Sequence, residues 1–250
     1  MRIILSGANG KMGKVLARSI AEKENMETVA GLDIVEDATG AFPIHNAASN
    51  FTEEADVIID FSNPAALPQV IALAENQNLP VVVATTGLST EQIADVKALS
   101  KKVPVFFSAN MSLGVNLLSE LVKKAAAILG DEFDIEIVEK HHNQKVDAPS
   151  GTALMLANAA KEGLSFEPEY VYERHSVRKK RDKKEIGISA VRAGTIVGEH
   201  DVIFGGHDEV ITLSHLAMSK EIFATGAINA AAFLIGKAPG MYSMKDMLEA

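Results

Sequence analysis

The sequence predicts an α/β protein with two domains, one built on a parallel sheet and one an α+β domain with a mixed sheet. Over roughly the first hundred residues, short apolar runs alternate with helical patterns, as in a parallel sheet that is covered on both faces. After Asn110 a long helical pattern precedes a strand, a helix and then several strands. The last helical pattern is expected to complete the first domain. We therefore expect one domain of residues 1–111 with 220–250 and another of residues 112–219.

The first domain is predicted from apolar runs and helical periodicity. Its strands are short apolar runs, and its helices place apolar side chains every three or four positions, such as Met12, Leu16 and Ile20. Ser89 or Thr90 is suited to cap one of these helices. The predicted strands are 3–5, 28–32, 57–61, 81–84 and 105–108, and the predicted helices are 11–24, 65–76 and 90–100.

The second domain is predicted to be richer in strands. Ser150 is placed to cap a helix that closes at Gly163. Gly205-Gly206, followed by His207-Asp208, predicts a hairpin between two strands. The predicted strands are 134–139, 186–192, 198–204 and 209–214; the predicted helices are 114–129 and 150–160, with 219–235 following the domain.

Composition excludes several classes of protein. The net charge of -9 argues against a nucleic-acid partner or an acidic membrane surface. The chain has no cysteine, which excludes disulfides and cysteine-ligated metals and fits a cytoplasmic location. Neither a signal segment nor a run of ~20 apolar residues is present, so we expect a soluble protein. The basic run 178–184 is expected to be a solvated loop, with a local anion or nucleotide role as the alternative.

The glycine-rich turn after the first predicted strand indicates a dinucleotide site. Gly7, Gly10 and Gly13 have the spacing G-x-x-G-x-x-G between a strand and a helix. Such glycines let the backbone approach a pyrophosphate at the helix N-terminus, so the first domain is predicted to be of the Rossmann type. Asp33, at the end of the second strand, is placed to bind an adenosine ribose hydroxyl. A plain glycine turn is the alternative.

Two further loops leave the carboxyl ends of predicted strands, where the ligand crevice of a doubly wound sheet lies. They are Ala84-Thr85-Thr86-Gly87 and Ser108-Ala109-Asn110-Met111-Ser112. Their small and hydroxyl side chains are suited to face ribose and nicotinamide. Taken alone, the pattern of each loop favours an ordinary turn. Phe61 could wall the cofactor or pack in the core.

The stretch from Glu139 to Ala153 carries the chemistry of the second domain. His141 and His142 supply imidazoles, Lys145 supplies an ammonium group, and Gly151-Thr152 opens a helix with backbone N–H groups. This combination suits a small anionic substrate that is protonated as it reacts. No metal site is expected, because adjacent histidines do not easily bind one ion together.

The other histidines of the second domain, and Arg174, lie outside this stretch of the sequence. Structural roles are expected for His200, His207 and His215, which fall on predicted strands and turns. Arg174 and His175 are candidates to approach the anion site from a distant loop.

The run His141-His142-x-x-Lys145-x-Asp147-Ala148-Pro149-Ser150-Gly151-Thr152-Ala153 resembles the signature of the 4-hydroxy-tetrahydrodipicolinate reductase (dihydrodipicolinate reductase) family. The resemblance extends nearly from end to end. It also includes Gly7 to Gly13, Asp60-Phe61-Ser62, Thr85-Thr86-Gly87, Arg192 to His200, and Phe223-Ala224-Thr225-Gly226-Ala227.

The resemblance implies that the chain reduces 4-hydroxy-tetrahydrodipicolinate, via dihydrodipicolinate, to tetrahydrodipicolinate with NADH or NADPH in the diaminopimelate route of lysine biosynthesis. It implies a small dianionic substrate, and a homotetramer built around the sheet of the second domain. It makes His141 the proton donor, Lys145 a second donor and charge partner, and His142, Gly151 and Thr152 substrate-binding residues. The implied cofactor contacts are Gly7, Ala8, Asn9, Gly10, Lys11, Met12, Asp33, Ala84, Thr85, Thr86, Ser108, Ala109, Asn110 and Met111.

One departure from the family pattern bears on the cofactor. Ile34 stands where many NADPH-using members place an arginine, and Glu36 and Asp37 follow it. A 2′-phosphate would lack its guanidinium partner, which mildly favours NADH. The alternatives are another NAD(P)-dependent Rossmann dehydrogenase and a non-catalytic NAD-binding redox regulator. The histidine–lysine loop argues against the regulator, which needs no proton donor.

Overall fold

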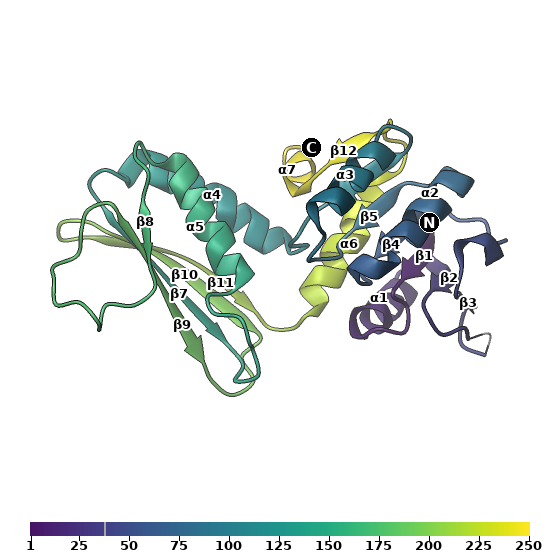
Figure 1. Cartoon of the computed structure of the whole chain (residues 1–250), viewed down its shortest axis with the longest axis horizontal. Helices are drawn as coiled ribbons and strands as arrows, with labels where there is room; N and C mark the ends of the chain where they lie inside the picture. Colours follow the sequence, from purple (N-terminus) through teal and green to yellow (C-terminus); the bar gives the residue numbers. More distant parts are fainter. Residues whose placement is uncertain (38) are drawn as a thin grey trace. The chain divides into compact units, whose positions relative to one another are not determined.

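A computed structural model describes residues 1–37 and 39–250, which form two compact units (Figure 1). The first unit comprises Met1–Ser112 and Glu221–Ala250, and the second comprises Leu113–Lys220. Within the described residues, each helix is too short or too polar to cross a bilayer.

The first unit is built on a parallel sheet of seven strands in the order β12-β6-β5-β4-β1-β2-β3. The strands are β1 (Arg2–Ser6), β2 (Glu27–Leu32), β3 (Ile44–His45), β4 (Val57–Asp60), β5 (Val81–Val83), β6 (Pro104–Phe107) and β12 (Gly240–Tyr242). Chain connections diverge on the two sides of β1, so the carboxyl ends of β1 and β4 flank the crevice in which such sheets bind ligands.

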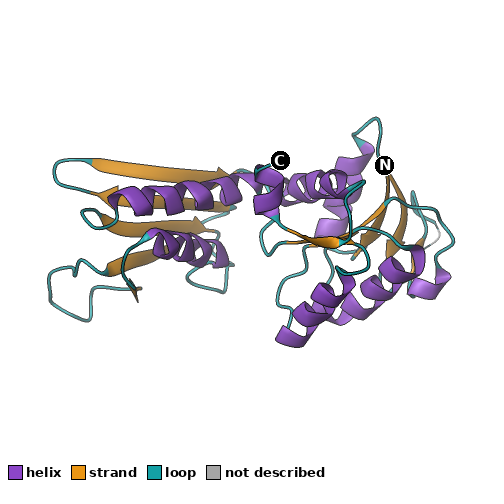
Figure 2. Cartoon of the chain, turned by 90° about the horizontal axis from the view of Figure 1, so that it is seen from above, coloured by secondary structure: helices purple, strands orange, loops and turns teal. Residues whose placement is uncertain are grey.

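Helices cover both faces of this sheet, as Figure 2 shows. Ile3 and Leu5 of β1 face one apolar cluster, which α1 (Lys11–Ala21) and α6 (Glu221–Leu234) complete. Ile4 faces the other, which α2 (Leu67–Gln77) and α3 (Thr90–Leu99) complete. This two-sided burial explains why the strands are continuous apolar runs rather than alternating ones. Short helices also occur at Ala48–Asn50, Pro64–Ala66 and Met244–Leu248 (α7).

The second unit has a mixed sheet of five strands in the order β11-β10-β7-β9-β8. The strands are β7 (Asp134–His141), β8 (Glu169–Val171), β9 (Glu185–Arg192), β10 (Gly198–Gly205) and β11 (Val210–Ala217). β7 runs parallel to β9 and antiparallel to β10, and the predicted hairpin joins β10 to β11. Helices α4 (Leu113–Leu129) and α5 (Gly151–Gly163) pack on one face of this sheet through a shared apolar cluster.

The structure confirms the predicted α/β class, with a parallel sheet in one unit and a mixed sheet in the other. β7 differs from its predicted range because it continues for two residues and ends at His141. His141 pairs with Arg192 of β9, and its carbonyl accepts a hydrogen bond from the Ala193 N–H at 2.9 Å. His141 therefore lies at the end of a strand rather than in the loop that follows it.

The basic run 178–184 connects β8 to β9 and is largely exposed, as expected for a loop. Arg181 is the exception. Its guanidinium donates to the Glu136 and Asp134 carboxylates, both at 3.0 Å, and to the Ile135 and Glu185 carbonyls at 3.0 and 2.5 Å. Arg181 thus fastens the loop to the strands that it joins.

Candidate active site

The turn between β1 and α1 has the geometry of a phosphate cradle. Gly7 has φ +79°, a left-handed conformation that favours glycine, and its N–H donates to the Leu32 carbonyl at 2.9 Å. A Cβ on Gly13 would lie 2.2 Å from the Gly7 oxygen, so only glycine lets α1 approach the turn this closely. Gly10, which precedes α1, has no side chain to cap the helix, and this leaves its first N–H groups to a ligand.

Asp33 lies beside this turn, just after β2. Its carboxylate accepts hydrogen bonds from the N–H groups of Asn9 and Ile34, both at 2.8 Å. Two backbone contacts fix the orientation of the carboxylate and leave acceptor capacity for hydroxyl groups. A cavity of about 570 Å³ opens here; Gly7, Asn9, Gly10, Asp33, Ile34 and Phe61 are among its lining residues. That volume lies within the range of small-molecule sites.

A buried carboxylate joins two of the predicted cofactor loops. Asp60, at the end of β4, accepts hydrogen bonds from the hydroxyls of Ser62 at 2.5 Å and Thr85 at 2.7 Å. Burial raises the pKa of Asp60, and these hydrogen bonds oppose that rise. The Thr85 side chain is therefore engaged by Asp60. Asp60 belongs to a predicted strand and to the family resemblance, but the sequence did not single it out for this role.

The other predicted cofactor residues differ in exposure. Ala8, Ala84 and Met111 are buried, whereas Lys11, Thr86 and Ala109 are exposed and Met12, Ser108 and Asn110 are intermediate. The Ser108 hydroxyl donates to the Asn110 carbonyl at 2.8 Å, which folds the loop after β6 on itself. The structure thus gathers Gly7, Asn9, Gly10 and Asp33 around one cavity.

The second unit carries a histidine held by a buried carboxylate. Glu139 and His141 are two residues apart on β7, so they share the face of the sheet that the helices cover. His141 Nδ1 lies 2.6 Å from Glu139 Oε2. An ionised carboxylate only accepts hydrogen bonds, so Nδ1 carries the hydrogen and Nε2 is the atom that exchanges a proton.

Arg192 of the neighbouring strand β9 completes the anchoring of Glu139. Its Nη1 and Nη2 donate to the two carboxylate oxygens, each at 2.8 Å, and Nη2 also donates to the Asp147 carbonyl at 2.7 Å. Burial alone would raise the pKa of Glu139, but hydrogen bonds from Arg192, His141 and the Ser150 N–H outweigh it and lower that pKa. Glu139 therefore stays ionised.

Burial lowers the pKa of His141, and the Glu139 carboxylate opposes this shift; Lys145 and Arg192 lower the pKa further. The neutral imidazole is thereby favoured in the free protein. An anion bound beside the ring would favour the imidazolium instead. His200 stacks edge-on against His141 with ring centroids 5.2 Å apart, and burial lowers the pKa of His200 to about 4.

The start of α5 is tied to the same cluster. The Ser150 hydroxyl accepts the Ala153 N–H at 3.1 Å and caps the helix, while the Ser150 N–H donates to Glu139 at 3.0 Å. Ser150 Oγ also lies 2.9 Å from His200 Nε2. Gly151 and Thr152 form the first turn of α5, whose N–H groups and positive dipole end attract anions. Lys145 lies in the loop between β7 and α5, 2.7 Å from Asp147.

The predicted residues His141, His142, Lys145, Gly151 and Thr152 all lie between the end of β7 and the first turn of α5. Four members of this cluster were given no catalytic or binding role from the sequence: Glu139, Ser150, Arg192 and His200. The alternation of side chains along a strand was a signal for Glu139, because it places the Glu139 carboxylate on the same face of the sheet as His141.

Arg174, a predicted candidate for the anion site, is held by carboxylates elsewhere in the second unit. Arg174 donates to Glu185 at 2.5 Å and to Glu136 at 2.6 Å, near the opposite ends of β9 and β7 from His141. Within the described residues, His, Asp and Glu side chains form no group of three that could hold a metal ion.

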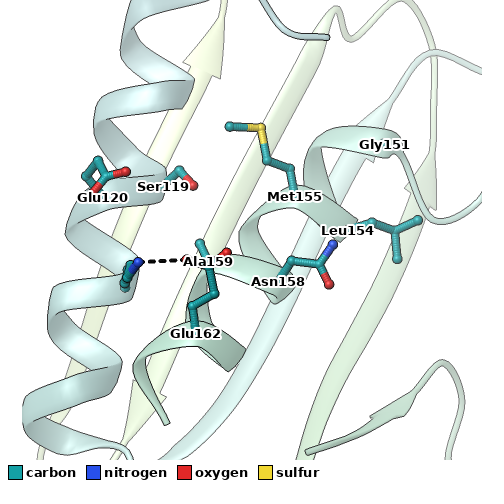
Figure 3. Close-up of a pocket in the computed structure, with 9 residues that line it drawn as sticks. Ser119, Glu120, Gly151, Leu154, Met155, Asn158, Ala159 and Glu162 are labelled. Atoms are coloured by element: carbon teal, nitrogen blue, oxygen red, sulfur yellow. Dashed lines mark hydrogen bonds and ion pairs between the residues drawn. The ribbon is translucent and has the colours of Figure 1, made fainter. Parts of the chain in front are cut away.

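A groove between α4 and α5 is separate from this histidine cluster (Figure 3). It has a volume of about 470 Å³, and its lining includes Gly151 but neither His141 nor Lys145. The Lys123–Glu162 ion pair, at 2.7 Å, joins its two helices. The groove is therefore a feature of helix packing and does not include His141, the predicted proton donor.

Comparison with known proteins matches both units. The family model described as "Dihydrodipicolinate reductase, N-terminus" matches residues 1–111, and "Dihydrodipicolinate reductase, C-terminus" matches residues 114–248. The 4-hydroxy-tetrahydrodipicolinate reductase of Caldanaerobacter subterraneus subsp. tengcongensis is 53% identical over 249 residues, which cover 100% of this chain and 98% of the relative. That of Clostridium novyi is 47% identical, covering 99% of this chain and 98% of the relative.

A solved structure agrees with these sequence relatives. The dipicolinate-bound dihydrodipicolinate reductase from Paenisporosarcina sp. TG-14 superposes with a TM-score of 0.81 at 26% identity, and 97% of each chain is covered. The similarity thus includes both the nucleotide-binding unit and the unit that carries the histidine cluster.

Proposed function

The chain belongs to the dihydrodipicolinate reductase family, and we propose on that basis that it reduces 4-hydroxy-tetrahydrodipicolinate, via dihydrodipicolinate, to tetrahydrodipicolinate. It is an NAD(P)H-dependent oxidoreductase of the diaminopimelate route of lysine biosynthesis. The observation that carries this function is the match along the whole chain to relatives named for this reaction.

The cradle of the first unit fits a nicotinamide nucleotide. The close approach of Gly13 to Gly7 and the left-handed φ of Gly7 leave space for a pyrophosphate, and Asp33 is oriented for a ribose hydroxyl. When bound, the reduced nicotinamide supplies the hydride. We propose that the loops at Ala84–Thr86 and Ser108–Met111 border the nicotinamide half, as the family resemblance implies.

We further propose that NADH is used at least as well as NADPH. Asp33 would repel a 2′-phosphate, and Ile34 beside it offers no hydrogen-bond donors in its side chain. The Ile34 side chain lines the cavity and is 87% exposed, so it stands where a guanidinium would have to lie.

The second unit supplies the proton and the counter-charge. We propose that His141 Nε2 protonates the reacting substrate as a general acid, an effect worth roughly 10²–10⁴ in rate. Lys145 and the first turn of α5 at Gly151 and Thr152 would bind the two carboxylates, with His142 as a further contact. The support for these roles is the position of all five residues at one end of β7 and α5.

We also propose a cytoplasmic homotetramer. The second sheet has one face covered by α4 and α5, and its other face carries apolar side chains that are partly exposed. Burial of that face against other copies of the chain would remove apolar surface from water.

The experiment that tests the function is NAD(P)H oxidation by the purified protein with 4-hydroxy-tetrahydrodipicolinate generated enzymatically in the cuvette. Turnover that requires both substrate and protein is the expected result. A Rossmann dehydrogenase of another specificity would bind NADH yet leave this substrate unreduced. A non-catalytic regulator would also bind NADH. It would differ from a Rossmann dehydrogenase in reducing or oxidising no amino-acid or aldehyde substrate.

A further inference from the structure

We propose that Glu139 and Arg192 are a positioning pair that fixes the tautomer and orientation of His141 and couples it to the anion-binding end of α5. The inference rests on the proposed function, in which His141 is the general acid. It adds two residues that would touch neither substrate nor cofactor and would act through His141 and Ser150.

Glu139 is the centre of the cluster because its two oxygens receive all of the anchoring contacts. Oε2 accepts His141 Nδ1 at 2.6 Å and Arg192 Nη1 at 2.8 Å. Oε1 accepts Arg192 Nη2 at 2.8 Å and the Ser150 N–H at 3.0 Å. Three elements, β7, β9 and the start of α5, therefore converge on one buried carboxylate. Such a two-pronged arginine contact fixes the plane of the carboxylate as well as its position.

The first consequence concerns His141. A ring whose Nδ1–H is held by a carboxylate presents Nε2 as its only site of proton exchange. Gly198 of β10 faces that atom, since a Cβ there would lie 3.1 Å from His141 Nε2. The Glu139 carboxylate also stabilises the imidazolium form of His141. Burial and the neighbouring cations, Lys145 and Arg192, destabilise that form.

The second consequence concerns the substrate carboxylates. The Ser150 N–H bond to Glu139 sets the position of the first turn of α5, and the Arg192 bond to the Asp147 carbonyl holds the loop that carries Lys145. A lone buried carboxylate would repel a dianionic substrate, but Arg192 balances its charge. The pair thus orients the acid without adding a net negative charge to the site.

Other titratable groups face His141 from the surrounding elements. His200 on β10 has a pKa of about 4 because of burial, and His215, its partner on β11, has a pKa that burial also lowers. Both rings are neutral near pH 7 and add no charge there. The groups left to set the charge state of His141 are Glu139, Arg192 and Lys145, with Asp147 bound to Lys145.

Glu139→Gln removes the charge while keeping the size of the side chain. We expect kcat to fall at least about tenfold, with little change in NADH affinity. A protonated acid is required for turnover, so activity is lost as pH rises through the pKa of His141. Without Glu139 the imidazolium is less stable, and the alkaline limb of the kcat/KM profile should move to lower pH.

Glu185→Gln is the matched control. Glu185 lies on β9, its side chain is only 1% exposed, and hydrogen bonds from Arg174 and Lys179 lower its pKa to about 2. This variant also loses a shielded, doubly paired carboxylate in the second sheet, but one distant from His141. It should lower thermal stability while leaving the alkaline limb in place. An equal displacement of the limb in both variants would overturn the positioning role.

The wild-type protein gives a test that depends on neither the folding of a variant nor turnover. Nitrogen-15 NMR of the histidine rings should show the neutral His141 ring with its hydrogen on Nδ1. A hydrogen on Nε2 overturns the proposal, as does Glu139→Gln with unchanged kcat and an unmoved alkaline limb. Absence of turnover in the wild type would instead refute the proposed function, and the NMR result would still decide the tautomer.

Discussion

Lys145 brings an ammonium group to the loop between β7 and α5, where we propose that it balances the charge of a dianionic substrate. Lys145→Ala is expected to raise KM about tenfold to hundredfold, since hydrogen bonds to charged groups contribute about 1.5–3 kcal/mol. It should also lower kcat and leave NADH affinity nearly unchanged. Steady-state kinetics and NADH titration measure these quantities.

Lys161→Ala is a suitable control for that variant, because Lys161 lies in the last turn of α5 and pairs with Glu167 at the surface. It should retain wild-type kinetics. If Lys145→Ala lowered only the affinity for NADH, Lys145 would belong to the cofactor site and its assignment to the substrate site would be wrong.

Ile34 lies beside the ribose-binding candidate Asp33 and bears on the choice between NADH and NADPH. The wild type is expected to use NADH at least as well as NADPH, and Ile34→Arg should shift the ratio of kcat/KM values toward NADPH, because a guanidinium pairs with a 2′-phosphate. Initial rates with each cofactor at matched substrate measure the ratio. A wild-type preference for NADPH above about tenfold, equivalent to ~1.4 kcal/mol, would contradict the charge argument.

Local spacing in the sequence predicted the site residues that are near one another in the chain. It did not predict the site residues that are brought together by the pairing of strands. His141 ends β7 and Lys145 lies in the loop that follows, so the two residues are close in the chain and their chemistry was visible in the sequence. Arg192 reaches Glu139 only because β9 pairs in parallel with β7, a pairing that no local pattern specifies. His200 lies on β10, whose pairing with β7 brings its ring to Ser150, a contact that local spacing does not predict.

At the scale of elements, α6 packs closely against a predicted cofactor loop. A Cβ on Gly226 would lie 1.7 Å from the Met111 carbonyl oxygen, which is backbone and cannot rotate away. Gly226→Ala is therefore expected to destabilise the protein by about 1–3 kcal/mol through overpacking. The measurement is the thermal midpoint, which should fall by roughly 2–4 °C for each kcal/mol in a chain of this size.

Gly205→Ala on β10 is the control for that substitution, because the space around Gly205 is open for a Cβ. Its midpoint should remain near that of the wild type. Equal stability of the two variants would show that the contact between α6 and the Met111 loop is not tight.

Periodicity predicted the long elements and missed the shortest ones. The buried strands and α1 to α6 have apolar patterns long enough to recognise, although the predicted end of α1 at 24 is three residues beyond the observed end at Ala21. β3, β8 and β12 have two or three residues each, and they form because a neighbouring parallel strand offers hydrogen bonds. Such strands carry no pattern of their own.

At the scale of the whole molecule, the uncovered face of the second sheet bears on assembly. Val191, Val210 and Leu216 project from that face and are 41%, 66% and 57% exposed. We expect light scattering at micromolar concentration to give about four times the 26.6 kDa mass of the chain. Leu216→Glu should reduce that mass by placing a charge in the contact. A wild-type monomer would refute the homotetramer.

We propose that His141, held by Glu139, protonates the substrate of this dihydrodipicolinate reductase. The most direct test is His141→Ala, assayed for NADH oxidation with enzymatically generated 4-hydroxy-tetrahydrodipicolinate and for NADH binding. We expect a kcat lower by on the order of 10²-fold or more, with NADH affinity and the folded state retained, which follows from the proposed role of His141 as proton donor. A variant that binds NADH normally and keeps the kcat of the wild type would contradict it.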